Sequence, residues 1–85
     1  MKARVYVTLR QGVLDPQGRA VLHALSSLGF DQVRDARIGK YVELEIADGP
    51  RDEAEKAVRE MAGRLLANPV IEDFRVEIAG EGEAR

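Results

Sequence analysis

The sequence predicts an α+β protein of the ferredoxin-like type, with a four-stranded antiparallel sheet and two helices on one face. Two observations carry this prediction. Segments with apolar side chains at every second residue indicate strands, and two segments with one apolar stripe at helical spacing indicate helices. Their order, strand-helix-strand-strand-helix-strand, fits two helices covering one sheet. The 85 residues allow one domain, which we assign to 1–79, followed by a loose tail at 80–85.

The first strand and helix have clear boundaries. Apolar residues alternate with polar ones over 4–10. Asp15 and Pro16 then favour a helix start, because Asp caps the first turn and Pro needs no donor at the first helical position. Gly29 suits the left-handed residue that ends many helices, so we predict a helix over 16–28. Its apolar stripe consists of Ala20, Val21, Ala24, Leu25 and Leu28.

The middle of the chain gives one weak and one strong strand. Charged residues interrupt the alternation over 33–38, so this strand is predicted only from its remaining apolar positions. Gly39 and Lys40 resemble a tight turn at the beginning of the next strand. The alternation over 41–46 is regular and predicts a strand with one apolar face.

The second helix and the last strand complete the pattern. Asp48 is a candidate N-cap, with a proline two residues later. Apolar residues at helical spacing follow over 54–66. Asn68 and Pro69 end the helix, because the residue before a proline is disfavoured in helical conformation. Alternation over 73–78 predicts the last strand.

Composition excludes several classes of function. The net charge is −2, and no basic stripe is present to neutralise nucleic-acid phosphates. Cysteine is absent, which excludes disulfides and thiolate chemistry and fits a reducing compartment. No membrane-length apolar run or signal-peptide core occurs, so we expect a cytoplasmic protein that binds no membrane. A domain this small also favours self-association.

The sequence offers no catalytic pair. His23 is the only histidine, and we interpret it as a partly exposed helix residue. Glu43 and Glu45 share one strand face with Asp73 and Glu77 nearby, which could bind a hard cation. Interleaved arginines favour surface ion pairs instead. We therefore predict no catalytic residue, no bound metal and no cofactor site.

The polar face of the predicted sheet has two open interpretations: it is either solvated or an association surface. An RNA-binding sheet is disfavoured, because the only candidate stacking residues, Tyr6 and Tyr41, lie beside acidic residues. An acylphosphatase-like enzyme is disfavoured too, because the loop after the first strand lacks a positioned arginine. The polar face comprises Arg4, Tyr6, Thr8, Tyr41, Glu43, Glu45, Arg75 and Glu77.

The loop over 12–18 is unusual because two apolar residues, Val13 and Leu14, precede a helix start. One interpretation is a hydrophobic staple that fixes the direction in which the chain enters the helix, with Leu14 in the preceding position. The other is a contact patch for a partner.

Four motifs together resemble the PurS family, the small subunits of phosphoribosylformylglycinamidine synthase. The resemblance extends from about Val5 to Ile78. The motifs are Gly12-Val13-Leu14-Asp15-Pro16-Gln17-Gly18, Leu28-Gly29-Phe30, Gly39-Lys40-Tyr41-Val42-Glu43-Leu44 and Leu65-Leu66-Ala67-Asn68-Pro69-Val70-Ile71-Glu72-Asp73. One departure is Ala62, where members of the family often carry cysteine.

The resemblance implies a subunit without activity of its own in de novo purine synthesis. The complex makes formylglycinamidine ribonucleotide from formylglycinamide ribonucleotide, glutamine and ATP. A glutaminase subunit (PurQ) releases ammonia, and a synthetase subunit (PurL) uses ATP and Mg. The family's small subunit is a homodimer or homotetramer that bridges the other two and assists ammonia transfer. The alternative is a stand-alone dimeric ferredoxin-like domain that binds a small-molecule effector.

The resemblance assigns two sets of residues. The candidate contacts with partners or with other copies are Leu14, Gln17, Lys40 and Tyr41. The motif residues with a structural explanation are Gly12, Asp15, Pro16, Gly18, Gly29, Gly39, Asn68 and Pro69.

Overall fold

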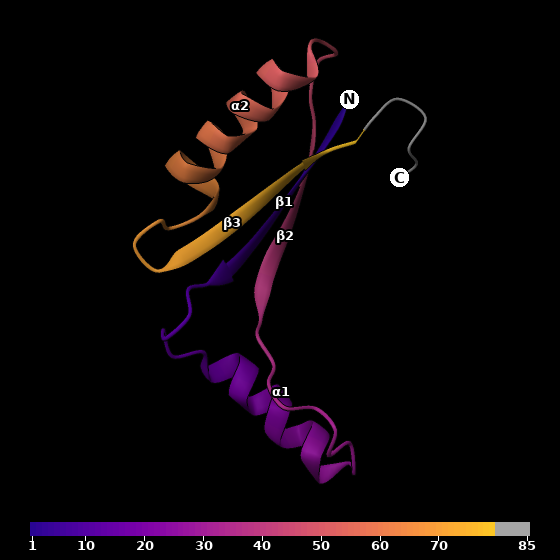
Figure 1. Cartoon of the computed structure of the whole chain (residues 1–85), viewed down its shortest axis with the longest axis vertical. Helices are drawn as coiled ribbons and strands as arrows, with labels where there is room; N and C mark the ends of the chain where they lie inside the picture. Colours follow the sequence, from indigo (N-terminus) through magenta and orange to yellow (C-terminus); the bar gives the residue numbers. More distant parts are fainter. Residues whose placement is uncertain (80–85) are drawn as a thin grey trace.

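The computed structural model describes residues 1–79 and contains one antiparallel sheet of three strands, two α-helices and a π-helical turn (Figure 1). The strand order is β2-β1-β3. The elements along the chain are β1 (Lys2–Leu9), α1 (Pro16–Ser27), β2 (Gly39–Glu45), α2 (Arg51–Met61), η1 (Ala62–Leu66) and β3 (Glu72–Ile78).

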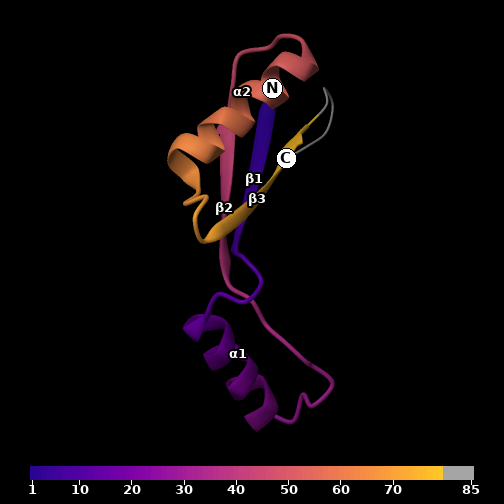
Figure 2. The same cartoon turned by 60° about the vertical axis from the view of Figure 1, so that its left-hand side comes forward.

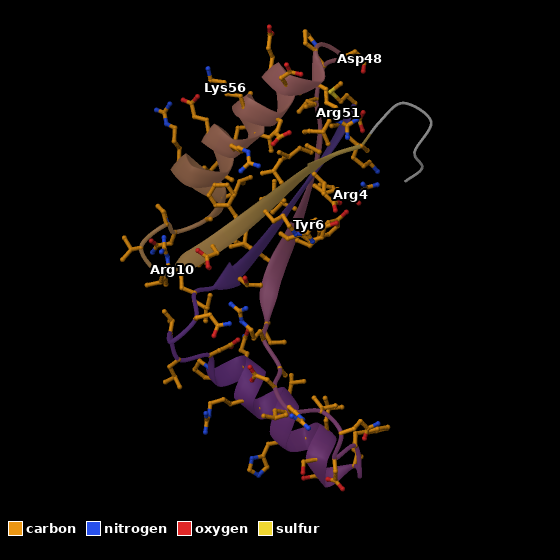
Figure 3. All side chains as sticks on the ribbon, in the orientation of Figure 1. Arg4, Tyr6, Arg10, Asp48, Arg51 and Lys56 are labelled. Atoms are coloured by element: carbon orange, nitrogen blue, oxygen red, sulfur yellow. The ribbon has the colours of Figure 1, made fainter. Side chains whose placement is uncertain are left out.

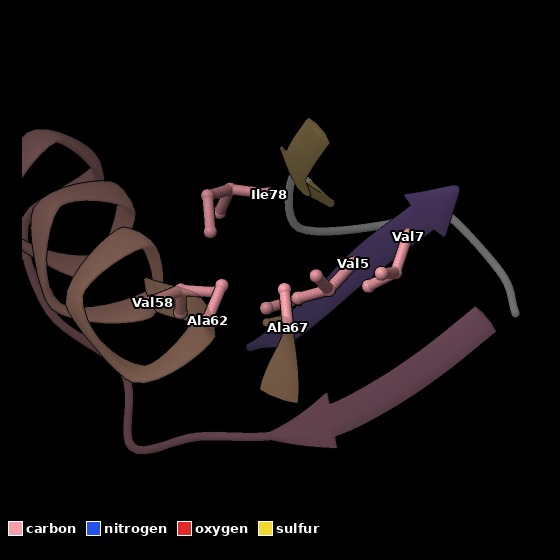
Figure 4. Packing of buried hydrophobic residues seen from close by; sticks show 7 residues of the cluster. Val5, Val7, Val58, Ala62, Ala67 and Ile78 are labelled. Atoms are coloured by element: carbon pink, nitrogen blue, oxygen red, sulfur yellow. The ribbon is translucent and has the colours of Figure 1, made fainter. Parts of the chain in front are cut away.

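β1 is the central strand, and one of its faces forms the core. Ala3, Val5 and Val7 are at most 1% exposed, because β2 and β3 flank them and α2 covers them. Val58 and Ala62 face this strand from the helical layer (Figure 4). The alternation predicted for the first, third and last strands is therefore confirmed, with apolar residues on the α2 side.

The strand predicted over 33–38 is wrong, and so is the prediction of a four-stranded sheet. Residues 33–38 contain no strand. The backbone N–H of Ile38 donates instead to Asp15 Oδ2 at 3.0 Å, and the Arg37 guanidinium donates to the carbonyl of Leu9. These bonds hold the segment beside the start of α1, where no neighbouring strand pairs with it. β2 begins directly at Gly39, so the predicted turn there is absent.

The prediction that both helices cover one face of the sheet is wrong as well. α2 lies against the sheet, whereas α1 lies beyond its end (Figures 1 and 2). The molecule is consequently long and thin, with extents of 48 × 31 × 14 Å and a radius of gyration of 16.0 Å. A compact chain of this length would have a radius of about 12 Å.

The predicted ends of α1 are confirmed. Asp15 caps the helix, because its Oδ1 accepts the backbone N–H of Gly18 at 2.9 Å, and Pro16 is the first helical residue. At the other end Gly29 has a φ of +95°, the left-handed conformation expected there.

The start of α2 differs from the prediction, whereas the helical region ends at Leu66, just before Asn68 and Pro69, as predicted. Asp48 does not cap the helix; its carboxylate accepts from the amino group of Met1 at 3.0 Å, and the N-cap is Pro50 without a side-chain bond. The helix continues into η1, where the N–H of Ala67 donates to the carbonyl of Ala62 at 2.8 Å. This wider turn brings Ala67 into the core, where it is 6% exposed.

Candidate functional site

The apolar stripe of α1 is largely exposed. Gly18 is the only buried residue of this helix, whereas Val21 is 39% and Leu28 73% exposed. Ala20 and Ala24 are exposed too, and Leu25 is partly buried. An amphipathic helix gains stability mainly by burying its apolar face. The stripe is therefore a surface on which a partner could pack.

The sheet face on which α2 lies is only partly covered on its β2 side. That helix lies over β3, while β2 receives no comparable cover within residues 1–79. The apolar side chains of β2 and the residue after it, Val42, Leu44 and Ile46, are only partly buried. The β2 side of this sheet face is therefore less covered than the β3 side.

We call the two segments that join α1 to the sheet, 10–15 and 28–38, the neck. Asp15 connects them, because one of its oxygens bonds to α1 and the other to Ile38. These two backbone donors, together with the charge of Arg37, hold the pKa of Asp15 below its ordinary value. The carboxylate is thus charged at neutral pH and accepts from both sides.

The polar face of the sheet carries a network of aromatic and charged side chains. The rings of Tyr6 and Tyr41 lie 5.2 Å apart, and the Arg75 guanidinium lies 4.1 Å from the centre of the Tyr6 ring. Tyr6 Oη donates to Glu77 at 2.9 Å, and Tyr41 Oη donates to Glu43 at 2.7 Å. Figure 3 shows Tyr6 and its neighbour Arg4 in this network.

These hydrogen bonds shift the pKa values of the tyrosine and glutamate side chains in the network. The hydrogen bond to Glu77 raises the pKa of Tyr6, and the bond to Glu43 raises that of Tyr41. The same bonds, with help from Arg75 and Lys2, lower the pKa of both carboxyl groups. Cations therefore pair with anions across the face, as the ion-pair interpretation predicts.

The residues that could catalyse or hold a metal are not brought together. Within residues 1–79 no group of three or more His, Asp or Glu side chains could hold a metal ion. His23 lines a shallow hollow with Arg19, Leu22 and Ser26, and it forms no hydrogen bond among the described residues. Nor is any helix of this part of the chain long and apolar enough to cross a membrane.

The four predicted contact residues do not form one surface. Gln17 and Lys40 line the same hollow of about 340 Å³ at the neck. Leu14 lines the adjacent hollow and is 69% exposed, so it does not form the predicted staple. Tyr41 lies on the opposite face of the sheet, beside Tyr6. As contacts, these residues stay predictions.

The comparisons with known proteins identify the family. The family model for PurS, described as phosphoribosylformylglycinamidine (FGAM) synthase, matches residues 2–80. The chain is 54% identical over 77 residues to the phosphoribosylformylglycinamidine synthase subunit PurS of Bacillus subtilis, covering 91% of this chain and 90% of that protein. The chain belongs to the PurS family. The resemblance seen in the sequence motifs is confirmed.

Solved PurS structures share the fold. The Bacillus subtilis PurS crystal structure superposes with a TM-score of 0.79 at 53% identity, covering 93% of this chain and 98% of that one. A chain of the PurLQS structure from Thermotoga maritima gives a TM-score of 0.81 at 30% identity, covering 89% of this chain and 93% of that one. The extended arrangement therefore resembles that of solved PurS structures.

The PurS motifs lie at the neck, along β2 and at the turn that precedes β3. The first motif contributes Gly12, with a φ of +86°, and Asp15. The third begins at Gly39, where an added Cβ would stand 2.0 Å from the carbonyl oxygen of Val7. In the last motif, Asn68 Oδ1 accepts from Val70 N–H at 3.0 Å and shapes the turn before β3. Sequence reasoning missed the bond between Asp15 and Ile38, which no local pattern signals.

Proposed function

We propose that this chain is the non-catalytic small subunit of phosphoribosylformylglycinamidine synthase. In this role it bridges the synthetase subunit PurL and the glutaminase subunit PurQ and assists the passage of ammonia between them. Membership of the PurS family carries the proposal. The likeness to a chain of the PurLQS structure from Thermotoga maritima supports assembly with other subunits.

The arrangement of side chains supports a role without catalysis. Nucleophilic catalysis needs a nucleophile within hydrogen-bond reach of a base that activates it. The only histidine stands alone on α1, and the acidic residues of the polar face pair with arginine and lysine. ATP and Mg are then used by the synthetase subunit, and this chain needs no cofactor. The lack of cysteine supports a cytoplasmic location.

The exposed stripe of α1 supports self-association. Each copy has one helix without a sheet to cover and one sheet face that is only partly covered on its β2 side. A dimer with a two-fold axis would bury both apolar surfaces, because the α1 of each copy would cover Val42, Leu44 and Ile46 of the other. We propose a homodimer of this kind, either alone or paired into a homotetramer.

Reconstitution tests the bridging role. The purified chain is mixed with the matching synthetase and glutaminase subunits, and glutamine-dependent product formation is measured with and without it. We expect activity with glutamine only when the chain is present. Activity with ammonium chloride should need the synthetase subunit alone, which serves as the control. Full glutamine-dependent activity without the chain would refute the bridging role.

The effector-binding alternative makes a different prediction. A small molecule that binds the folded chain would raise its Tm, and the rise would grow with the logarithm of ligand concentration once the ligand exceeds its dissociation constant. The bridging role predicts no such shift with ATP or glutamine for the isolated chain. Family membership favours the bridging role.

A further inference from the structure

The Asp15 side chain fastens together two parts of the chain that are far apart in sequence. Its Oδ1 accepts the N–H of Gly18, in the first turn of α1, at 2.9 Å. Its Oδ2 accepts the N–H of Ile38, just before β2, at 3.0 Å. We call Asp15 with these two amide groups the Asp15 clasp. The clasp therefore fixes the beginning of α1 against the segment that returns to the sheet.

Close backbone packing reinforces the clasp. A Cβ added at Gly18 would stand 2.3 Å from the carbonyl oxygen of Ala36, so the first turn of α1 lies directly against this segment. The Arg37 guanidinium donates to the carbonyl of Leu9 and ties the end of β1 to the same place. Since Gly18 is the only buried residue of α1, the direction of the helix is determined at the neck.

Chain length alone does not keep α1 away from its own sheet. The neck segment 10–15 can span up to about 20 Å when extended, and 28–38 can span more. A closed monomer could place the α1 stripe on its own β2 and bury the same apolar side chains as the proposed dimer. When two arrangements share their contacts, the geometry of the connecting segments decides between them.

We propose that the Asp15 clasp directs α1 away from its own sheet and thereby selects association with a second copy over a closed monomer. This inference rests on the self-association proposed above. Asp15 is then a positioning residue for assembly: it needs no contact with the other copy, because it acts through the direction of α1. A carboxylate suits this position, because each of its two oxygens accepts one of the two amide N–H groups and its charge strengthens both bonds.

Sedimentation equilibrium of Asp15→Ala tests the proposal, with small-angle scattering of each species. We expect the dissociation constant of the dimer to rise at least about tenfold, because the bonds lost are to a charged acceptor. We also expect a monomer whose radius of gyration falls from 16.0 Å towards about 12 Å. Asp35→Ala is the matched control: the Asp35 carboxylate lies in the same neck but accepts only from the N–H of Ala36, at 2.9 Å. It should leave the dimer unchanged.

A second variant keeps the proposal testable if Asp15→Ala does not fold. Gly18→Ala keeps the Asp15 residue, but its Cβ would stand 2.3 Å from the carbonyl oxygen of Ala36 and 2.8 Å from Asp15 Oδ2. The substitution therefore forces the first turn of α1 away from Ala36 and disturbs the clasp, so it should weaken the dimer as well. Dimers of wild-type affinity in both variants would refute the clasp and leave self-association standing. A wild-type chain that stays monomeric at all concentrations would instead refute self-association itself.

Discussion

Leu28 offers a direct test of the exposed α1 stripe. The substitution Leu28→Ala removes three carbon atoms from a side chain that is 73% exposed in one copy. Each buried carbon contributes about 0.8 kcal/mol, so burial of the exposed part would give about 1.7 kcal/mol per copy. A two-fold dimer contains the contact twice, which gives about 3.5 kcal/mol, or roughly a 300-fold increase in the dissociation constant.

Analytical ultracentrifugation over a concentration series measures this constant. Leu65→Ala is the control, because Leu65 is 82% exposed but lies in η1, on the far side of the neck from α1. Far-ultraviolet circular dichroism should show that both variants keep their helices. A Leu28→Ala dimer within threefold of the wild-type affinity would refute the reasoning, since the largest exposed side chain of the stripe would then lie outside the interface.

Three further predictions concern the fold and its titrating groups. Val58→Ala should lower the free energy of unfolding in urea by about 2 kcal/mol, since the side chain is fully buried, whereas Val70→Ala at 80% exposure should change little. Asp15 has a pKa lowered from 3.8, so its stabilising effect is complete above that pH and is lost as the pH falls. Asp15→Asn should therefore be less stable than wild type at pH 7, and urea titrations should show the difference shrinking as the pH falls below 3.8 through the lowered pKa. Glu77→Gln should lower the pKa of Tyr6, followed as phenolate absorbance, and an unchanged value would contradict the hydrogen bond assigned to Glu77.

Local patterns predicted the parts of the fold that local chemistry determines. Asp15, Pro16 and Gly29 predicted the ends of α1, because capping and left-handed glycine depend only on neighbouring residues. Period-two alternation predicted β1, the regular part of β2 and β3. Such patterns state which side of an element is apolar, but they do not state what covers that side.

The errors come from contacts between distant residues. The alternation over 33–38 predicts a further strand, yet Ile38 bonds to Asp15, 23 residues away. The apolar stripe of α1 predicts packing on the sheet of the same chain, because a sequence pattern shows that one side of a helix is apolar but not what covers it. Asp48 is a residue type that favours the N-cap position, but its carboxylate accepts a hydrogen bond from the amino group of Met1 instead.

The sequence predicts the class of the candidate site, a surface for partners, but not where its residues lie. Composition and the lone His23 predicted a surface for partners rather than a catalytic centre. The motifs predict four contact residues, and in the structure Leu14, Gln17 and Lys40 lie at the neck whereas Tyr41 lies on the polar sheet face. Only the sheet register shows that Tyr41 lies opposite Tyr6.

The pairing of the two tyrosines gives the chain a built-in optical reporter. The sequence contains two tyrosines and no tryptophan, so its near-ultraviolet fluorescence comes almost entirely from one place on the polar sheet face. A partner that docks there would displace Arg75 from the Tyr6 ring and change the emission. Association through α1 would leave the signal nearly constant. Titrating each partner without a label would therefore reveal which of the two surfaces it occupies.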